Sequence, residues 1–329
     1  MNNRRGIAML AALWLVVGIT VVAVEFSLVG RERRQVGIAA ADRARASAGA
    51  LGAFAMTQAQ LESALRAGPQ STSGAIGGAR AADPWLGVDS VYSGSRLVDS
   101  MRVDVQVIDL GTRLNVNALS ESELRTLFSN LLSDFVLADQ LAQAIADWRD
   151  PDDIARARGG ERDDYIRAKL LRVPTNQNFR DVEELLDVKG ITQDIYAVVS
   201  PYLTTLGAAQ VNLNSAPVAV LRVLPGMTDE IVSRILSTRS RGGRIASVAD
   251  VMPQARGGLG RGVQDAQAAQ NQRTQQAISA RAGVLTTQLQ VTLRAYASPA
   301  ARPVRLRVLV QRSVLRGAPA AGVSAEEWR

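Results

Sequence analysis

Residues 4–30 read RRGIAMLAALWLVVGITVVAVEFSLVG, and this stretch decides which solvent surrounds the start of the chain. Its apolar run is unbroken from Ile7 to Val24. A helix of about 20 apolar residues crosses a bilayer, whereas a cleaved secretory signal has an apolar region of about 7 to 15 residues and a small-residue cleavage site. No Ala-x-Ala-like site stands directly after this run. The pattern therefore predicts a retained membrane anchor, and arginines on both sides leave its orientation open.

The helix that begins in the anchor is expected to continue far beyond the membrane. No proline occurs between Arg31 and Arg66, alanine is abundant there, and apolar residues such as Leu61 and Leu65 recur at helical spacing. We predict one helix over residues 7–66, with its first half in lipid and its second half on a globular domain. Gly68 and Pro69 end it.

The rest of the chain combines short strands with a long helical block. Apolar residues alternate with polar ones over 103–107, 289–295 and 304–311, which is the pattern of half-buried strands, and the last two are expected to pair antiparallel. Between them, residues 120–251 read as helices, starting with a capping box at Ser120 and Glu123. The predicted class is α+β: a long N-terminal transmembrane stem helix packed on an antiparallel sheet that is interrupted by a large all-helical insertion.

Composition excludes many kinds of active site. The 329 residues include no cysteine and no histidine, so thiol nucleophiles, imidazole bases and Cys/His zinc sites are ruled out. The net charge of +7 invites a nucleic-acid interpretation, but the arginines are scattered and only 4% of the residues are aromatic. We expect a solvated basic surface and no enzymatic activity.

Two motifs recur within the helical block. An Asn-x-Asn segment precedes a helix start at both 115–117 and 212–214, where asparagine can cap a helix. Residues 184–192 and 220–228 resemble helix-hairpin-helix turns, which often bind DNA phosphates through backbone N–H groups. Both carry threonine, Thr192 and Thr228, where a second glycine would allow close phosphate approach. This difference argues against phosphate binding. A membrane-anchored DNA receptor of a competence-like system is therefore kept as the alternative function and not as the main one.

The start of the chain resembles the type IV pilin and pseudopilin class. The resemblance lies in a short basic leader, Arg4-Arg5-Gly6, followed by an apolar stem. It implies that a prepilin peptidase cleaves between Gly6 and Ile7 and that the new amine of Ile7 is methylated. Most members have glutamate at the fifth mature position, where this chain has Ala11. An ordinary transmembrane helix would also explain Ala11, and an uncleaved anchor on a periplasmic scaffold is a third interpretation.

Four further segments resemble the minor pseudopilin K of type II secretion, which also lacks that glutamate. They are residues 109–117, 146–153, 179–185 and 211–217. The resemblance implies a non-enzymatic subunit at the tip of the pseudopilus, involved in its initiation or capping and in protein export across the outer membrane. It implies as partners the minor pseudopilins I and J, the major pseudopilin and the prepilin peptidase, with nucleic acid not expected. It also implies a single-pass protein of the bacterial inner membrane with its globular part in the periplasm.

This resemblance also sets the expected domain boundaries. They are a leader over 1–6, the transmembrane and stem helix over 7–66, the pilin-like domain over 67–118 and 283–317, an inserted helical domain over 119–252, a flexible tract over 253–282 and a loose tail over 318–329.

An acidic loop in the inserted domain is a candidate metal site. Its seven acids are Asp147, Asp150, Asp152, Asp153, Glu161, Asp163 and Asp164. Hard oxygen ligands on a flexible loop suit Ca²⁺, which takes six to eight of them. Arginines in the same span make surface salt bridges an equal alternative, and the spacing of an EF-hand is absent. No other cofactor is expected.

Overall fold

The computed structural model describes residues 3–67, 83–207, 210–253, 261–298, 301–315 and 318–328. The α-helices are α1 (Asn3–Ala67), α2 (Val88–Tyr92), α3 (Glu121–Leu132), α4 (Phe135–Arg149), α5 (Arg162–Arg167), α6 (Gln193–Val199), α7 (Val218–Leu221), α8 (Asp229–Ser240) and α9 (Arg261–Arg281). The 3-10 helices are η1 (Leu110–Thr112), η2 (Val182–Asp187), η3 (Ser200–Tyr202) and η4 (Val248–Val251). The strands are β1 (Gly94–Val98), β2 (Met101–Asp109), β3 (Leu114–Asn115), β4 (Leu203–Thr204), β5 (Val211–Asn212), β6 (Ala282–Gly283), β7 (Gln288–Tyr296), β8 (Val304–Leu315) and β9 (Ala318–Trp328).

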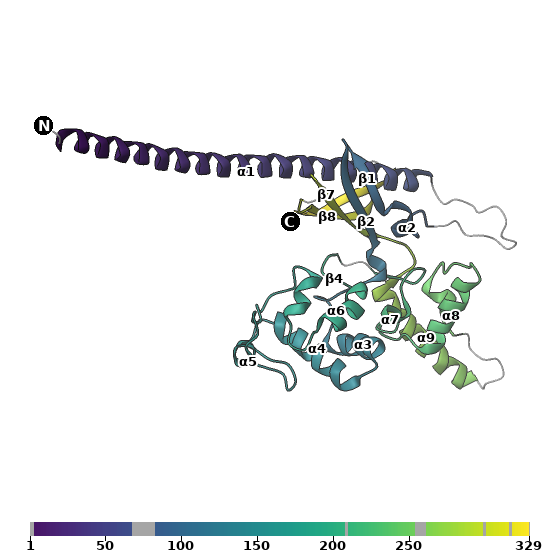
Figure 1. Ribbon diagram of the computed structural model, residues 1–329. Helices are drawn as coiled ribbons and strands as arrows, with labels where there is room; N and C mark the ends of the chain where they lie inside the picture. The colour runs from purple at the N-terminus through teal and green to yellow at the C-terminus, as the bar shows by residue number, and fades with distance from the viewer. Residues whose placement is uncertain are drawn as a thin grey trace.

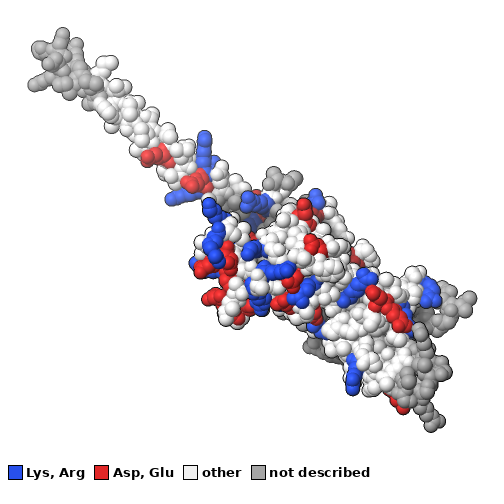
Figure 2. Space-filling model, turned by 90° about the horizontal axis from the view of Figure 1, so that it is seen from below, with Lys and Arg blue, Asp and Glu red and all other residues white. Residues whose placement is uncertain are grey.

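The stem is one unbroken helix of 65 residues, which confirms the prediction of a single helix through anchor and stem. Its first half projects from the molecule, and Figure 2 shows the described part of this half as an almost uncharged surface. Among the described residues, α1 is the one helix long and apolar enough to cross a membrane. Its second half is amphipathic, and buried residues such as Ala50, Ala53 and Leu61 pack it against the sheet.

The sheet beneath the stem has five antiparallel strands in the order β1-β2-β7-β8-β9. The predicted pairing of the last two strands is confirmed, with Leu293 opposite Leu306 and Val291 opposite Val308. Alternation along each strand places one set of side chains, including Val105, in the core beneath α1. The other set faces away from the stem, and the ribbon of Figure 1 shows the inserted domain on that side of the sheet.

Two predicted flexible segments are regular in the structure. The loose tail over 318–329 is wrong, because Ala318–Trp328 form β9 and pair with β8. The open edge of β8 would otherwise present unpaired backbone groups. The flexible tract over 253–282 is also wrong over its described part, since residues 261–281 form α9. Glutamine, alanine and arginine are good helix formers, and Ile278 is fully buried in the core of the inserted domain.

The inserted domain has a hydrophobic core of its own, separate from the core between stem and sheet. It contains helices α3 to α9 and hangs from the sheet on the side opposite the stem (Figure 1). The predicted capping box at Ser120 and Glu123 is present, with Glu123 N–H donating to the serine hydroxyl at 3.3 Å. The next helix of the predicted helical block is α4, which is capped by the side chain of Asp134.

The Asn-x-Asn motif marks two structurally related halves of this domain. The first asparagine, Asn115 or Asn212, accepts a hydrogen bond from the N–H two residues further on. The second, Asn117 or Asn214, accepts from and donates to the backbone of a distant residue, Phe179 in one half and Ile245 in the other. The asparagines are therefore not helix caps, because those positions are taken by Ser120 and Pro217.

Two arginines extend the correspondence between the halves. The Arg149 guanidinium donates to the carbonyls of Val116 and Leu119. The Arg239 guanidinium donates to Leu213, with Nε at 2.9 Å, and to Ala216 at 2.7 Å. In each half an arginine at or near the end of a helix thus secures the turn that follows the Asn-x-Asn segment. Burial lowers the pKa of both guanidinium groups.

Candidate functional site: the stem and the acidic loop

The predicted processing residues all lie in the first turns of α1. Gly6, Ile7 and Ala11 are helical, and their side chains lie outside the described part of the chain. Cleavage between Gly6 and Ile7, and methylation of Ile7, stay predictions. A cut at this point would remove a leader with two arginines and leave an apolar residue as the new N-terminus of the stem.

The projecting half of α1 has no partner within the chain. Its apolar side chains are exposed; Trp14 is 73% exposed and Phe26 is 81% exposed. A shallow apolar groove runs along one side of it beside Gly18, where no Cβ stands out from the helix. Such a surface requires hydrocarbon or other apolar helices around it, and small residues allow helices to approach closely. The same surface suits both a membrane span and a bundle of stems.

The acids of the predicted metal loop lie on different elements and differ in burial. Asp147 is fully buried at the end of α4, and Asp150 is the residue that ends this helix. Asp152 and Asp153 are exposed in the loop. Glu161 precedes α5, and Asp163 and Asp164 lie in its first turn. Among the described residues, no three acidic groups are gathered as ready metal ligands.

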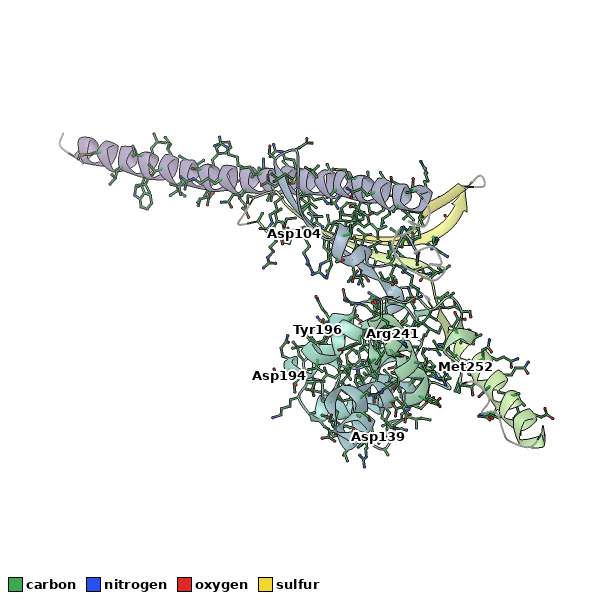
Figure 3. The ribbon with its side chains drawn as sticks, turned by 90° about the vertical axis from the view of Figure 1, so that its right-hand side faces the viewer. Asp104, Asp139, Asp194, Tyr196, Arg241 and Met252 are labelled. Atoms are coloured by element: carbon green, nitrogen blue, oxygen red, sulfur yellow. The ribbon has the colours of Figure 1, made fainter. Side chains whose placement is uncertain are left out.

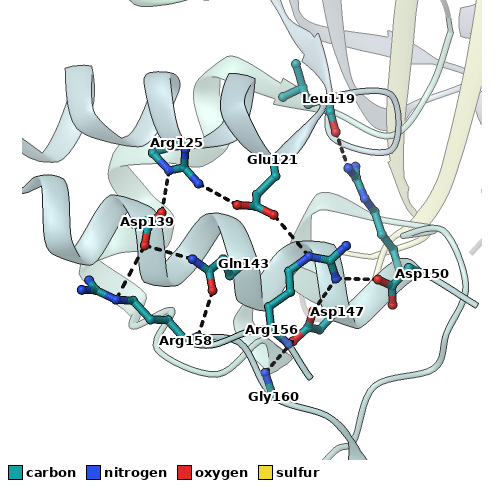
Figure 4. Close-up of polar contacts among 11 residues, drawn as sticks. Leu119, Glu121, Arg125, Asp139, Gln143, Asp147, Asp150, Arg156, Arg158 and Gly160 are labelled. Atoms are coloured by element: carbon teal, nitrogen blue, oxygen red, sulfur yellow. Dashed lines mark hydrogen bonds and ion pairs between the residues drawn. The ribbon is translucent and has the colours of Figure 1, made fainter. Parts of the chain in front are cut away.

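An arginine occupies the centre of the acidic loop (Figure 4). Arg156 Nη1 lies 2.5 Å from carboxylate oxygens of both Asp147 and Asp150, and its Nε lies 3.2 Å from Glu121. Asp147 Oδ2 also accepts the backbone N–H of Gly160 at 2.7 Å. A Cβ at Gly159 would overlap this carboxylate, so glycine is required beside it. The salt-bridge interpretation is thus confirmed for Asp147 and Asp150.

The outer acids make contacts of their own. Asp164 accepts the Glu161 N–H at 3.0 Å and pairs with Arg167 at 2.5 Å. Asp153 accepts from the side-chain amide of Asn176 at 2.9 Å. The seven predicted ligands therefore do not form one cluster in the absence of a metal.

Glu161 differs from the other acids of the loop. Its side chain is buried, and neither carboxylate oxygen has a hydrogen-bond partner; one oxygen of Asp150 is in the same state. Burial, followed by the negative charges of Asp147 and Asp150, raises the pKa of Glu161 to about 7. Unpartnered buried carboxylate oxygens beside further carboxylates have the donor chemistry that Ca²⁺ prefers. Asp147, Asp150 and Glu161 are therefore the nearest approach to a cation site in this loop, but they are not gathered as ready ligands, and Arg156 supplies the competing positive charge.

The two hairpin turns pack against the interior of the domain. Gly190 and Gly226 both have positive φ, +90° and +79°, which explains the glycines. A Cβ at Gly190 would lie 3.2 Å from the Leu141 side chain, and one at Gly226 would lie 3.3 Å from that of Thr274. The hydroxyls of Thr192 and Thr228 cap the following helices. This geometry favours a structural role for both turns over phosphate binding.

The fold is that of a pilin-like protein, a stem helix on an antiparallel sheet, with an inserted helical domain. A solved chain in the crystal structure of the GspK-GspI-GspJ complex from the enterotoxigenic Escherichia coli type 2 secretion system has this fold, with a TM-score of 0.57 and 16% identity. The match covers 87% of this chain and 96% of that chain.

The chain is similar to protein K of type II secretion systems, which confirms the resemblance seen in the sequence. Residues 112–208 match the family model described as type II secretion system protein K. The protein K of Pectobacterium carotovorum subsp. carotovorum is 30% identical over 168 residues, which are 44% of this chain and 51% of that protein. The protein K of Pseudomonas aeruginosa is 26% identical over 259 residues, 70% of this chain and 72% of that protein. The chain thus spans about half the length of the Pectobacterium relative and nearly three quarters of the Pseudomonas one.

Proposed function

We propose that this chain is a minor pseudopilin at the tip of a type II secretion pseudopilus, where it initiates or caps the filament during protein export across the outer membrane. The observation that carries the proposal is the combination of an exposed apolar stem with a second, separately folded body on the far side of the sheet. The stem suits a bundle of like helices, and the inserted domain is too large to be a simple loop. The role is structural, without catalysis.

The size of the inserted domain argues for the tip. In a thin filament each globular part has neighbours above and beside it, whereas the last subunit has free space above. The strands β2 and β7 are antiparallel neighbours, and Asp109 lies opposite Leu289. A short turn can therefore replace the residues between them without disturbing the sheet.

This connection permits a direct test. The variant without the insertion should enter filament shafts, whereas the full chain should label only their ends, with gold-labelled antibody against a tag as the readout. Labelling of the shortened variant at tips alone would show that bulk does not decide the position.

Ala11 supports the same position by a charge argument. A carboxylate in hydrocarbon costs several kcal/mol and is retained where it pairs with a buried cation, such as the N-terminal amine of a neighbouring stem. A tip subunit has no neighbour above that could supply such an amine. Adding Ala11→Glu to the shortened variant should increase its incorporation into shafts. Unchanged incorporation would show that Ala11 does not determine the position of the subunit in the filament.

Processing at Gly6 separates this proposal from a plain membrane scaffold. Mass spectrometry of the N-terminus, with the chain expressed beside a prepilin peptidase, should find methylated Ile7. An intact Met1 terminus in the presence of active peptidase would favour the uncleaved scaffold.

The proposed partners are the minor pseudopilins I and J and the major pseudopilin. The name of the solved complex, which joins the E. coli protein K to proteins I and J, supports the first two. The proposed location is the inner membrane, with the globular part in the periplasm. Co-purification of the detergent-solubilised chain with tagged I and J tests the assembly. Recovery of neither partner from cells that express all three would count against it.

We also propose that the acidic loop binds Ca²⁺ through Asp147, Asp150 and Glu161, with the outer acids as further candidates. The unpartnered oxygens of Glu161 support it. Calorimetry of the chain with millimolar Ca²⁺ should give saturable heat that Glu161→Gln abolishes and that Glu230→Gln, at an exposed position of α8, leaves unchanged. Absence of heat with the unmodified chain would exclude the site.

A further inference from the structure

A polar cleft separates the sheet from the inserted domain. It has a volume of about 300 Å³ and is open to solvent on one side. Strands β2, β7 and β8 form one wall, and η2, α6 and η3 form the other. Figure 3 places Tyr196, from α6, on the side of the inserted domain that is turned toward the sheet.

The sheet wall of this cleft is polar because side chains alternate along the strands, with apolar ones toward the stem and polar ones toward the cleft. Residues that point away from the stem include Thr292, Arg294, Arg305 and Arg307. Two of these arginines form ion pairs with acids at the start of η2 in the inserted domain. Arg307 lies 3.5 Å from Asp181, and Arg305 lies 3.8 Å from Glu183. These ion pairs join the two domains across the cleft.

Positive charge remains in excess in the cleft. Four guanidinium groups line it, from Arg113, Arg294, Arg305 and Arg307, against the two carboxylates of Asp181 and Glu183. Arg113 donates to the carbonyl of Leu203 at 3.2 Å, and its burial lowers its pKa. Within the part of the chain that the structure describes, no carboxylate lies within ion-pair distance of Arg113.

Arg294 is the second cation of the cleft that has no salt bridge to a described residue. It lies directly opposite Asp104 on β2, but that carboxylate pairs with Arg102 at 2.9 Å. On its other side Arg294 lies opposite Arg305. Like charges directly opposite each other destabilise a sheet, and a largely buried cation such as Arg113 is costly without a counter-charge. An anion between these side chains would remove both penalties.

We propose that this cleft binds a small ligand that carries an oxyanion, a carboxylate or a phosphate, held by Arg113 and Arg294. Guanidinium groups offer paired donors whose spacing matches such oxyanions. The volume lies at the lower end of the range for small-molecule sites. Thr292 and Tyr196 line the same cleft and can supply neutral hydrogen bonds.

A ligand in this place would contact both domains at once. Arg294 belongs to the sheet, whereas Arg113 lies where the chain enters the inserted domain. Binding would therefore hold the inserted domain in one position relative to the stem and the sheet. This inference is independent of the proposed tip location, since it concerns the cleft within a single chain.

Calorimetry of the detergent-solubilised full chain tests the site with two probes, citrate and inorganic phosphate. The unmodified chain should bind at least one of them saturably. Arg113→Gln and Arg294→Gln should each weaken binding at least tenfold, because each removes charge-assisted hydrogen bonds. Arg234→Gln is the matched control: it also removes a guanidinium group, which lies on α8 outside the cleft and pairs with Glu230, and it should leave the affinity unchanged.

The outcomes separate the ligand classes. Binding of citrate alone identifies a carboxylate site, binding of phosphate alone identifies a phosphate site, and each supports the proposal. Saturation by neither probe, or equal affinity in all variants, would overturn it. If Arg113→Gln does not fold, Arg294→Gln still decides, and Arg113→Lys provides a second variant that keeps the charge but loses the paired donors.

Discussion

Arg149 and Arg239 occupy corresponding places in the two halves of the inserted domain. Each guanidinium satisfies backbone carbonyls of the turn that follows an Asn-x-Asn segment. Carbonyls in such a turn have no partner in a helix or sheet, and leaving them unsatisfied in a buried site is costly. The planar fork of arginine reaches two carbonyls at once, which lysine cannot do.

Replacing Arg239 with lysine should therefore destabilise the inserted domain. We expect a loss of about 1–3 kcal/mol in the free energy of unfolding, because buried acceptors lose their donors. Chemical denaturation followed by circular dichroism measures the change. Arg222→Lys is the matched control, because Arg222 pairs with Asp229, whose side chain is 85% exposed, and the substitution should change stability little. Equal effects of the two substitutions would contradict the assigned role.

Asp109 connects the end of β2 to the inserted domain and should make stability depend on pH. It is buried and accepts hydrogen bonds from Gly111 N–H at 2.8 Å, Ser215 at 2.9 Å and Thr286 at 3.0 Å. Burial nevertheless raises its pKa. The folded chain therefore holds this proton to a higher pH than the unfolded chain does. Its contribution to stability is complete below the unfolded pKa of about 4 and is lost as pH rises through the folded pKa.

The stability of the unmodified chain relative to Asp109→Asn should consequently be greater at pH 4 than at pH 7, as measured by urea denaturation at both pH values. Asp104→Asn is a control of opposite sign. The hydrogen bond from Arg102 lowers the pKa of Asp104, so its contribution is present at neutral pH and disappears in acid. The effect should be small, because this carboxylate is near the surface. A pH-independent difference for Asp109→Asn would refute the assignment.

At the scale of elements, the stem changes its environment along its length. Its first half exposes apolar side chains on all sides, as lipid or neighbouring stems require, whereas its second half buries one stripe against the sheet. Leu61 is fully buried there, and its carbonyl accepts the indole N–H of Trp85 at 3.1 Å. Leu51, three turns earlier on the same helix, is 46% exposed.

This contrast yields a test of how the stem is attached. Leu61→Ala should cost about 2–5 kcal/mol, because it removes buried methyl groups and leaves a cavity. Leu51→Ala should cost much less, because its side chain already contacts solvent. Thermal unfolding of both variants in the same detergent measures the difference. Similar losses in both variants would show that this part of the helix is not bound to the sheet as described.

At the scale of the whole molecule, two hydrophobic cores are joined by a narrow polar connection. One core lies between stem and sheet, and the other lies within the inserted domain. Asp109 and the ion pair between Arg307 and Asp181 are among the contacts between them. Separate cores with few shared apolar contacts unfold as separate cooperative units.

Calorimetry should accordingly resolve two unfolding transitions. Leu61→Ala should lower the midpoint of one transition, and Leu141→Ala, in the core of the inserted domain, should lower the other. The two midpoints should shift independently, because the sites share no core. A single transition that both substitutions lower equally would show that the cores unfold together.

Much of this architecture could be predicted from the sequence because it depends on local patterns. The apolar run from Ile7 to Val24 predicted the membrane-length helix, and the alternation over 103–107 predicted a half-buried strand. Ser120 and Glu123 marked a helix start through contacts within one turn. Periodicity and capping are properties of neighbouring residues, so they can be read before the chain is folded.

What the sequence could not decide depends on residues far apart in the chain. The tail forms β9 because it pairs with the edge of β8. Helix α9 is ordered because Ile278 packs in a core that other helices form. The acids of the loop were visible as a group, but only the tertiary structure placed Arg156 between Asp147 and Asp150 and left Glu161 without a partner. The cleft beside Arg113 and Arg294 has no local signature at all. It exists because the polar face of a sheet meets an inserted domain, and such a meeting is set by packing between distant segments.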